Sequence, residues 1–139
     1  MARGAPAAAW VRRVVRAALA AAGGGGRPVS VFLTGDRAIR AVNKRHLKHD
    51  YATDVIAFPL EGDVPPPGAP DLLGDVVVSV ETARRAAREL DLPFREELAR
   101  YLVHGTLHLL GHDDKKEPAR SRMHRVQEAV LERFFKELG

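Results

Sequence analysis

The chain has 139 residues, of which 45% are hydrophobic, enough for one domain over residues 1–139 with an apolar core. It contains no cysteine, which excludes disulfides and thiolate metal ligands, so any metal must be held by histidine and carboxylate. The formal net charge of +4 favours polyanionic partners such as nucleic acid.

The first segment, Met1 to Ala22, is rich in alanine and arginine and poor in acidic residues, as transit peptides are. Arginines interrupt its apolar residues, and no uninterrupted apolar segment is long enough for a signal sequence or a membrane span. We therefore expect a cytoplasmic protein without a membrane partner, beginning with an amphipathic helix over Pro6 to Ala22. The apolar stripe of this helix consists of Trp10, Val11, Val14, Val15, Ala18 and Leu19.

The next segments predict the first part of a β-sheet. Val29 to Leu33 is typical of a strand, and a helix is expected over Gly35 to Leu47. A polar turn follows, and Val55 to Leu60 predicts a second strand. Residues 61–70 contain four prolines and two glycines and predict a loop.

The third strand is expected in the middle of the sheet, because Leu72 to Val80 is almost continuously apolar. Ser79 is a candidate N-cap for a helix over Glu81 to Leu90. Two further helices are predicted over Phe94 to Leu110 and from Pro118 to about Glu137. Because helices and strands intermingle, we predict an α+β domain, a small mixed β-sheet packed by about five helices with the fourth helix at the centre.

Two histidines four residues apart lie in the apolar run of the fourth predicted helix. His104 and His108 would share one face of that helix, about one turn apart, so both imidazoles can reach one metal ion. Gly111 is placed to end the helix, so the chain can turn back and present a third ligand. The donors that follow are His112, Asp113 and Asp114. Three protein ligands and an open position are typical of catalytic zinc, and the alternative is a helix with two hydrogen-bonded core histidines beside an acidic turn.

The residue after the first histidine distinguishes this pattern from that of metalloproteases. Those enzymes carry a glutamate there as the general base, whereas this chain has Gly105. Peptide hydrolysis thereby loses its base and is disfavoured, while a zincin-like hydrolase of another substrate stays an alternative.

The sequence His-Gly-Thr-Leu-His-Leu-Leu-Gly-His-Asp-Asp at 104–114 resembles the signature of the YbeY family, bacterial metal-dependent endoribonucleases of ribosomal RNA maturation. Asn43 followed by the segment Thr53 to Pro59 is similar to a second stretch of that family. Leu73-Gly74-Asp75 before an apolar strand is similar to a third. The resemblance covers about residues 29–135 and implies a zincin-like metal helix at the centre of the fold.

The resemblance implies a single-strand-specific, metal-dependent endoribonuclease, a hydrolase acting in 16S rRNA 3′-end maturation and ribosome quality control. It implies one zinc ion per chain, single-stranded rRNA as substrate, and the ribosome or small-subunit proteins as partners. A different reading is a non-catalytic ribosome-biogenesis factor with a structural metal and an RNA-binding face. The ion itself stays open, since two histidines and a carboxylate also suit Ni²⁺, Co²⁺ or Fe²⁺.

Two positions depart from the family pattern. The third metal ligand of the family is usually histidine, and Asp114 stands at that position here, with His112 as its rival. Carboxylate oxygen is an acceptable zinc ligand, so the resemblance assigns the third ligand to Asp114. Leu47 stands where many members carry an arginine thought to contact RNA phosphate. Basic residues nearby that could supply the missing charge are Lys44, Arg45 and Lys48.

The general base is not identified by the sequence. The candidates, each also typical of a turn or of a residue that orients a ligand, are His112, Asp113 and His49. An orienting contact to a liganding imidazole would be natural for Asp113. Thr53 and Asp54 are expected to line the cleft or to cap the following strand, and no role is assigned to His46 or His124.

Overall fold

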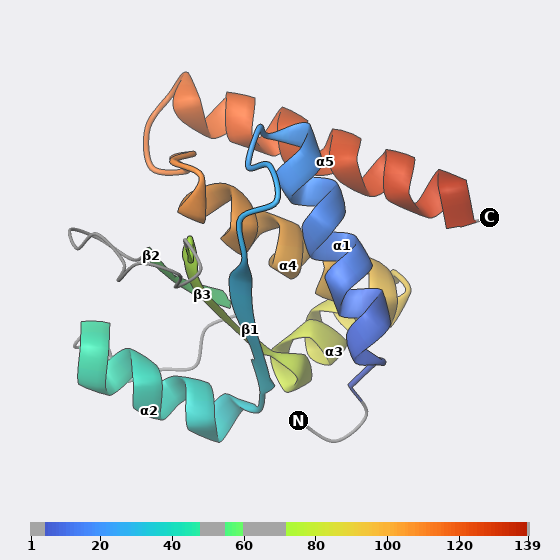
Figure 1. Ribbon diagram of the computed structural model, residues 1–139. Helices are drawn as coiled ribbons and strands as arrows, with labels where there is room; N and C mark the ends of the chain where they lie inside the picture. The colour runs from blue at the N-terminus through green and yellow to red at the C-terminus, as the bar shows by residue number, and fades with distance from the viewer. Residues whose placement is uncertain (1–4, 48–54, 60–71, 139) are drawn as a thin grey trace.

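The computed structural model describes residues 5–47, 55–59 and 72–138 (Figure 1). The elements are α1 (Ala8–Ala21), β1 (Val29–Thr34), α2 (Asp36–Leu47), β2 (Val55–Pro59), β3 (Gly74–Ser79), α3 (Val80–Glu89), α4 (Phe94–Leu109) and α5 (Ala119–Leu138). All the predicted strands and helices are present in the predicted order, with ends that move by no more than two residues.

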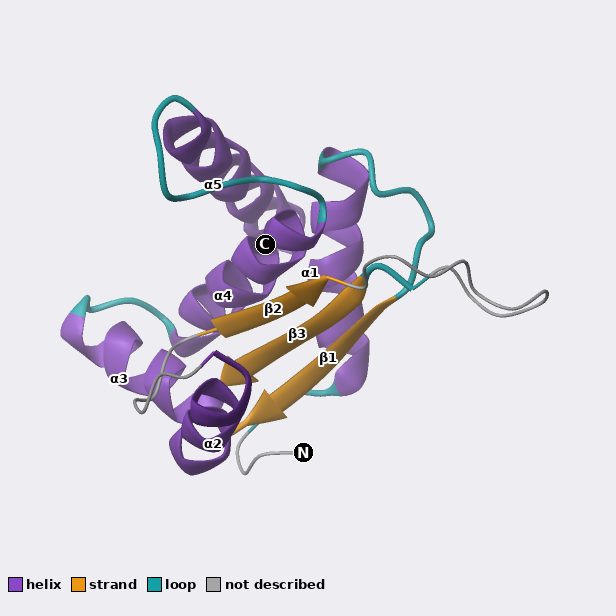
Figure 2. Ribbon diagram, turned by 90° about the vertical axis from the view of Figure 1, so that its left-hand side faces the viewer, coloured by secondary structure: helices purple, strands orange, loops and turns teal. Residues whose placement is uncertain are grey.

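The three strands form one mixed sheet in the order β1-β3-β2 (Figure 2). Strand β3 pairs in parallel with β1 and antiparallel with β2. The continuously apolar strand is therefore the central one, as expected for a strand that is covered on both faces. The predicted α+β class is confirmed, with five helices around a small mixed sheet in the described residues.

Helices cover the two faces of the sheet unequally. Along β3, Val76 and Val78 point into a large core that contains α4, whereas Val77 points to the opposite face, against Ile39 of α2. Helix α4 packs against α1, α3 and α5 as well as against β2 and β3. Its fully buried apolar residues are Leu98, Ala99, Leu102, Val103 and Leu107. The helix that carries both histidines is thus the centre of the fold.

Helix α1 buries its whole predicted apolar stripe, from Trp10 to Leu19. It packs on α4 and α5, with Trp10 edge-on to the ring of Phe134 at a centroid distance of 6.2 Å. Among the helices that the structure describes, none combines the length and the apolar character needed to cross a bilayer.

Helix α4 approaches the sheet closely at Gly105. A Cβ atom at this position would lie 2.7 Å from Cγ1 of Val76 and 3.0 Å from Cγ2 of Val55, so only glycine fits without a shift of the neighbours. Position 105 therefore faces the sheet, and the two histidines that flank it in the helix keep part of their surface exposed.

The beginnings of α2 and α3 are joined by a shared hydrogen-bond network. Ser79 is the N-cap of α3, as predicted, because its Oγ accepts from the Thr82 N–H at 3.2 Å. The same hydroxyl donates to the Asp36 carboxylate at 2.6 Å, which also accepts from the Thr82 hydroxyl and from Arg85. Burial alone would raise the pKa of Asp36, but the bonds from Arg85, Ser79 and Thr82 outweigh it and lower the pKa to about 2.

Candidate metal centre

Three potential ligand atoms meet at the C-terminal end of α4. Nε2 of His108 lies 3.1 Å from Nε2 of His104, and Oδ2 of Asp114 lies 3.2 Å from Nε2 of His104 and 3.3 Å from Nε2 of His108. With metal–ligand bonds of about 2.0–2.1 Å, two ligands of a tetrahedral zinc ion are separated by about 3.3 Å. The three atoms have the spacing of one face of such a tetrahedron, so this donor set fits a metal ion.

The turn after α4 explains how the third side chain reaches the two histidines. Gly111 has a φ of 94°, in the region that favours glycine. The His112 N–H donates to the Leu107 carbonyl at 3.0 Å, and the Gly111 N–H donates to the His108 carbonyl at 3.1 Å. These two bonds form a Schellman motif, which ends the helix and reverses the chain. Asp114 then lies three residues after the glycine, next to the face that the helix presents.

A glutamine on α5 sets the protonation pattern of the first histidine. Oε1 of Gln127 lies 2.8 Å from Nδ1 of His104, and an amide oxygen can only accept, so this ring nitrogen carries the proton. The lone pair of His104 is thereby left on Nε2, the atom that faces His108 and Asp114. The amide orientation is itself fixed, because Nε2 of Gln127 donates to Oε2 of Glu128 at 3.0 Å. Gln127 is 6% exposed, so water does not compete strongly for this contact.

Behind the glutamine, an ion-pair network ties α5 to α4. Arg100 donates to both carboxylate oxygens of Glu128, each at 3.0 Å, and to Oε1 of Glu97 at 2.7 Å. Burial would raise the pKa of Glu128, but the hydrogen bonds from Arg100 and Gln127 outweigh it and leave the pKa below its usual value. Glu128 is therefore ionised at neutral pH and is available to accept from Gln127.

The sequence alone does not reveal this supporting network. Its members lie on two helices, and their pairing depends on how the helices are aligned with each other. One signal was present: Gln127 is a polar residue within the apolar stripe of the last helix, between Met123 and Val130. A polar side chain at such a position must find a partner inside the protein.

Asp114 is suited to act as an anionic metal ligand. Burial would raise the pKa of its carboxyl, but the electrostatic attraction of His108 and His104 outweighs this effect, and the pKa lies below its usual value. The carboxylate is therefore charged at neutral pH, as metal coordination requires.

Among the described residues, the candidates His112 and Asp113 do not join the three ligand atoms. His112 and Asp113 line a separate small pocket of about 190 Å³, and Oδ1 of Asp113 accepts from the Lys115 N–H at 2.9 Å. His49 lies outside the described residues, and so do Lys48, Thr53 and Asp54. The same holds for the side chains of His46 and Leu47, whereas Lys44 and Arg45 are exposed on α2.

A larger pocket of about 770 Å³ opens beside the ligand atoms, between the end of α4 and the first turns of α5. Its lining residues are His104, Asp114, Glu117, Arg120, Ser121, Met123, His124, Arg125 and Gln127. His124, to which the sequence pattern assigns no role, is exposed at this pocket. The candidate metal centre is thus accessible from a cleft of the size in which small-molecule ligands bind, about 300–1,000 Å³.

A solved structure with the same fold is the solution structure of a protein from Thermotoga maritima. It superposes with a TM-score of 0.67 at 24% sequence identity, and the match covers 97% of this chain and 88% of that one. At this level of identity the likeness concerns the fold.

Relatives with higher identity share a single description. A protein from an Anaeromyxobacter species is 47% identical over 131 residues, which are 94% of this chain and 66% of the relative. A protein from Thermus thermophilus is 42% identical over 123 residues, 87% of this chain and 86% of the relative. A Myxococcus xanthus relative is 48% identical, and the match covers 36% of its length. All three are named Endoribonuclease YbeY, and the chain spans about two thirds or less of the length of the first and the third.

A family model described as Endoribonuclease YbeY matches residues 4–135, nearly the whole chain. Together with relatives at this identity, the match shows that the chain belongs to the YbeY family.

Proposed function

We propose that the protein is a metal-dependent endoribonuclease that hydrolyses phosphodiester bonds in single-stranded RNA. The observation that carries the proposal is the triangle of His104, His108 and Asp114, spaced for one ion beside an open pocket. Membership of a family whose relatives are named endoribonucleases supports RNA as the substrate. The net charge of +4 is in keeping with a polyanionic partner.

Each part of the site has a proposed role. The three side chains are the ligands of one divalent ion, for which we propose zinc. Such an ion, when bound, supplies Lewis-acid activation of water and of a phosphoryl oxygen. Gln127 keeps the lone pair of His104 on Nε2, and the carboxylate of Asp114 offsets part of the charge of the ion.

The general base remains a proposal among three residues, His112, Asp113 and His49. The first two line the small pocket that adjoins the Gly111 turn. The pH dependence of the cleavage rate in each single alanine variant separates them, because loss of the true base removes the corresponding limb of the profile.

A metalloprotease-like activity receives little support from the geometry. In that mechanism the residue after the first histidine is a glutamate that acts as general base on the metal-bound water. Here this position is Gly105, which faces Val76 of the central strand at a distance that admits no further atom. A base at this place would point into the sheet and away from the ligand atoms.

We further propose that residues 1–139 act as one domain in the cytoplasm, in 16S rRNA 3′-end maturation and ribosome quality control. The ribosome or small-subunit proteins are the proposed partners. The family resemblance supports this role, and the alternative is a non-catalytic biogenesis factor that binds RNA around a structural metal.

Cleavage of a fluorescent single-stranded RNA by zinc-loaded protein tests the proposal. We expect cleavage that stops with a chelator and in His104→Ala, with little cleavage of the same sequence in a duplex. Metal content is measured in parallel, so that a loss of activity can be assigned to a loss of the ion. Wild-type protein that holds zinc and binds RNA in a salt-dependent way but leaves it intact would favour the non-catalytic alternative. Incubation with a peptide substrate under the same conditions tests the alternative of a metalloprotease-like activity.

A further inference from the structure

We propose that the pocket beside the candidate metal centre is a subsite for an RNA phosphate adjacent to the scissile one, and that Arg120 and Arg125 of α5 bind that phosphate. This inference rests on the proposed function, because it names where the flanking part of the same RNA lies.

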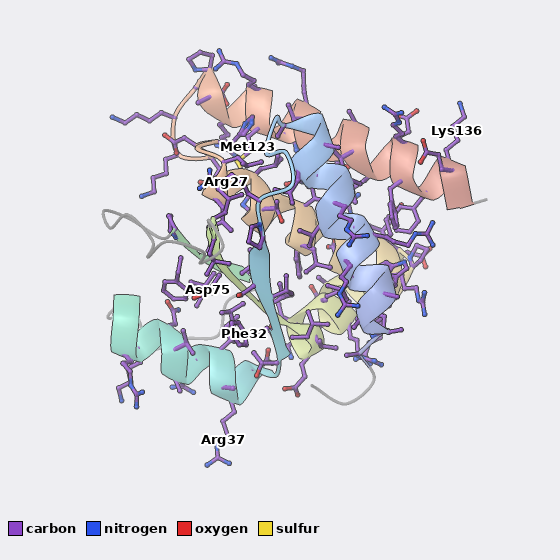
Figure 3. All side chains as sticks on the ribbon, viewed as in Figure 1. Arg27, Phe32, Arg37, Asp75, Met123 and Lys136 are labelled. Atoms are coloured by element: carbon purple, nitrogen blue, oxygen red, sulfur yellow. The ribbon has the colours of Figure 1, made fainter. Side chains whose placement is uncertain are left out.

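The pocket shares a wall with the ligand atoms. His104 and Asp114 line it on one side, and the first turns of α5 line it on the other. Its floor includes Met123, labelled in Figure 3, which is 1% exposed and belongs to the hydrophobic core. A group bound in this pocket is therefore next to the metal ligands and lies against a residue of the hydrophobic core.

One side of α5 contains both Gln127, which contacts the metal ligand His104, and Arg120. Gln127 touches His104, and His124 and Arg120 lie three and seven residues before it, on the same side of the helix. Seven residues of helix span about 10 Å along the axis. The guanidinium of Arg120 is thus placed away from the ligand atoms, where a neighbouring phosphate of the same strand would lie.

The two arginines have no acidic partner within the described part of the chain. By contrast, Arg100 of α4 is paired with Glu128, and Arg133 of α5 is paired with Glu137. Arg120 and Arg125 are exposed at the pocket, and no ion pair joins either of them to a described residue. Unpaired guanidinium groups facing a concave surface attract anions, and their planar fork matches two phosphate oxygens.

The charge balance of the pocket couples the subsite to the metal. Its two carboxylates, Asp114 and Glu117, formally offset the two arginines, and the Glu117 carboxylate also accepts a hydrogen bond from Ser121. A divalent ion at the ligand atoms makes the pocket positive as a whole. Phosphate should therefore bind more tightly when the ion is present, and the ion should bind more tightly when RNA is present.

Binding of a short fluorescein-labelled oligouridylate, followed by anisotropy, tests the subsite. Measurements are made on chelator-treated protein, so that RNA is not cleaved, at several salt concentrations. We expect Arg120→Ala and Arg125→Ala each to weaken binding by about three- to ten-fold and to reduce the slope of log K against log salt by about one. Arg120→Lys keeps the charge and should retain most of that slope.

Arg122→Ala is the matched control. It removes the same charge from the same helix, but its side chain lines the small pocket with His112 and Asp113. Zinc content of all variants should equal that of the wild type, because none of them alters a ligand atom.

The outcomes separate the subsite from the proposed function. If wild-type protein cleaves RNA while Arg120→Ala and Arg125→Ala bind like wild type, the subsite is wrong and the function stands. An equal loss of RNA affinity in Arg122→Ala would show that only the net charge of the protein matters, and it would also overturn the subsite. Wild-type protein that neither binds nor cleaves the oligonucleotide would overturn both.

Discussion

The contact between Gln127 and His104 can be tested by Gln127→Leu, which keeps the size of the side chain but removes its acceptor and its donor. The variant leaves Nδ1–H of His104 without its acceptor at 2.8 Å, in a place where the glutamine is 6% exposed. An unsatisfied buried donor costs about 1–3 kcal/mol, and removing the partner of a liganding histidine lowers metal affinity by about 10- to 100-fold. We expect a loss of zinc affinity in that range, about 1.4–2.7 kcal/mol.

Competition with a chromophoric chelator measures zinc affinity, and urea unfolding of the metal-free variant measures the structural part of the effect. Gln127→Glu is the matched variant, since its carboxylate still accepts from His104 but no longer donates to Glu128. Zinc affinity should be higher in Gln127→Glu than in Gln127→Leu if the His104 contact matters. Wild-type zinc affinity in Gln127→Leu would refute the argument that this glutamine selects the tautomer.

Further predictions concern the ligands and the stability of the fold. Asp114→Ala should lose more zinc than His112→Ala, and Asp114→His should remain folded and loaded, because an imidazole at that position also reaches the other ligand atoms; elemental analysis of the three proteins decides. Asp36→Asn should lower the free energy of unfolding at neutral pH by about 1 kcal/mol. The Asp36 carboxylate is partly exposed, so solvent screening makes its contribution to stability smaller than its full pKa shift implies. Because the pKa of Asp36 falls to about 2, wild-type stability should decline between pH 4 and pH 2, and urea titrations should show a weaker decline in the variant. Gly105→Ala should destabilise by about 1–2 kcal/mol despite the helix preference of alanine, and an equal loss in the Val76→Ala background would contradict the clash at 2.7 Å.

Most of the fold can be predicted from local sequence patterns. The continuous apolar run of β3 predicts a central strand, and the apolar stripe of α1 at helical spacing predicts a packed helix, because each pattern lies within one continuous segment. The spacing of His104 and His108 and the glycine after them likewise predict that two imidazoles and a donor from the returning chain converge, and the family resemblance adds that this donor is Asp114.

The parts that the sequence could not predict depend on distant segments. The bond from Gln127 to His104 joins positions 23 residues apart, and it requires a particular alignment of α5 on α4. The side to which His112 and Asp113 turn after Gly111 is likewise decided by backbone geometry, so residue type alone could not exclude them from the ligand triangle. The segment with His49 lies outside the described residues, and its part in the site stays a prediction.

The short distance along the chain between the three ligands has a consequence for folding. Because one helical turn and one reversal contain all of them, an unfolded chain keeps the three donors close together and retains some affinity for the ion. Binding to both states reduces the stabilisation that the metal gives to the native state. Saturating zinc should therefore raise the melting temperature by less than its native-state affinity alone would produce.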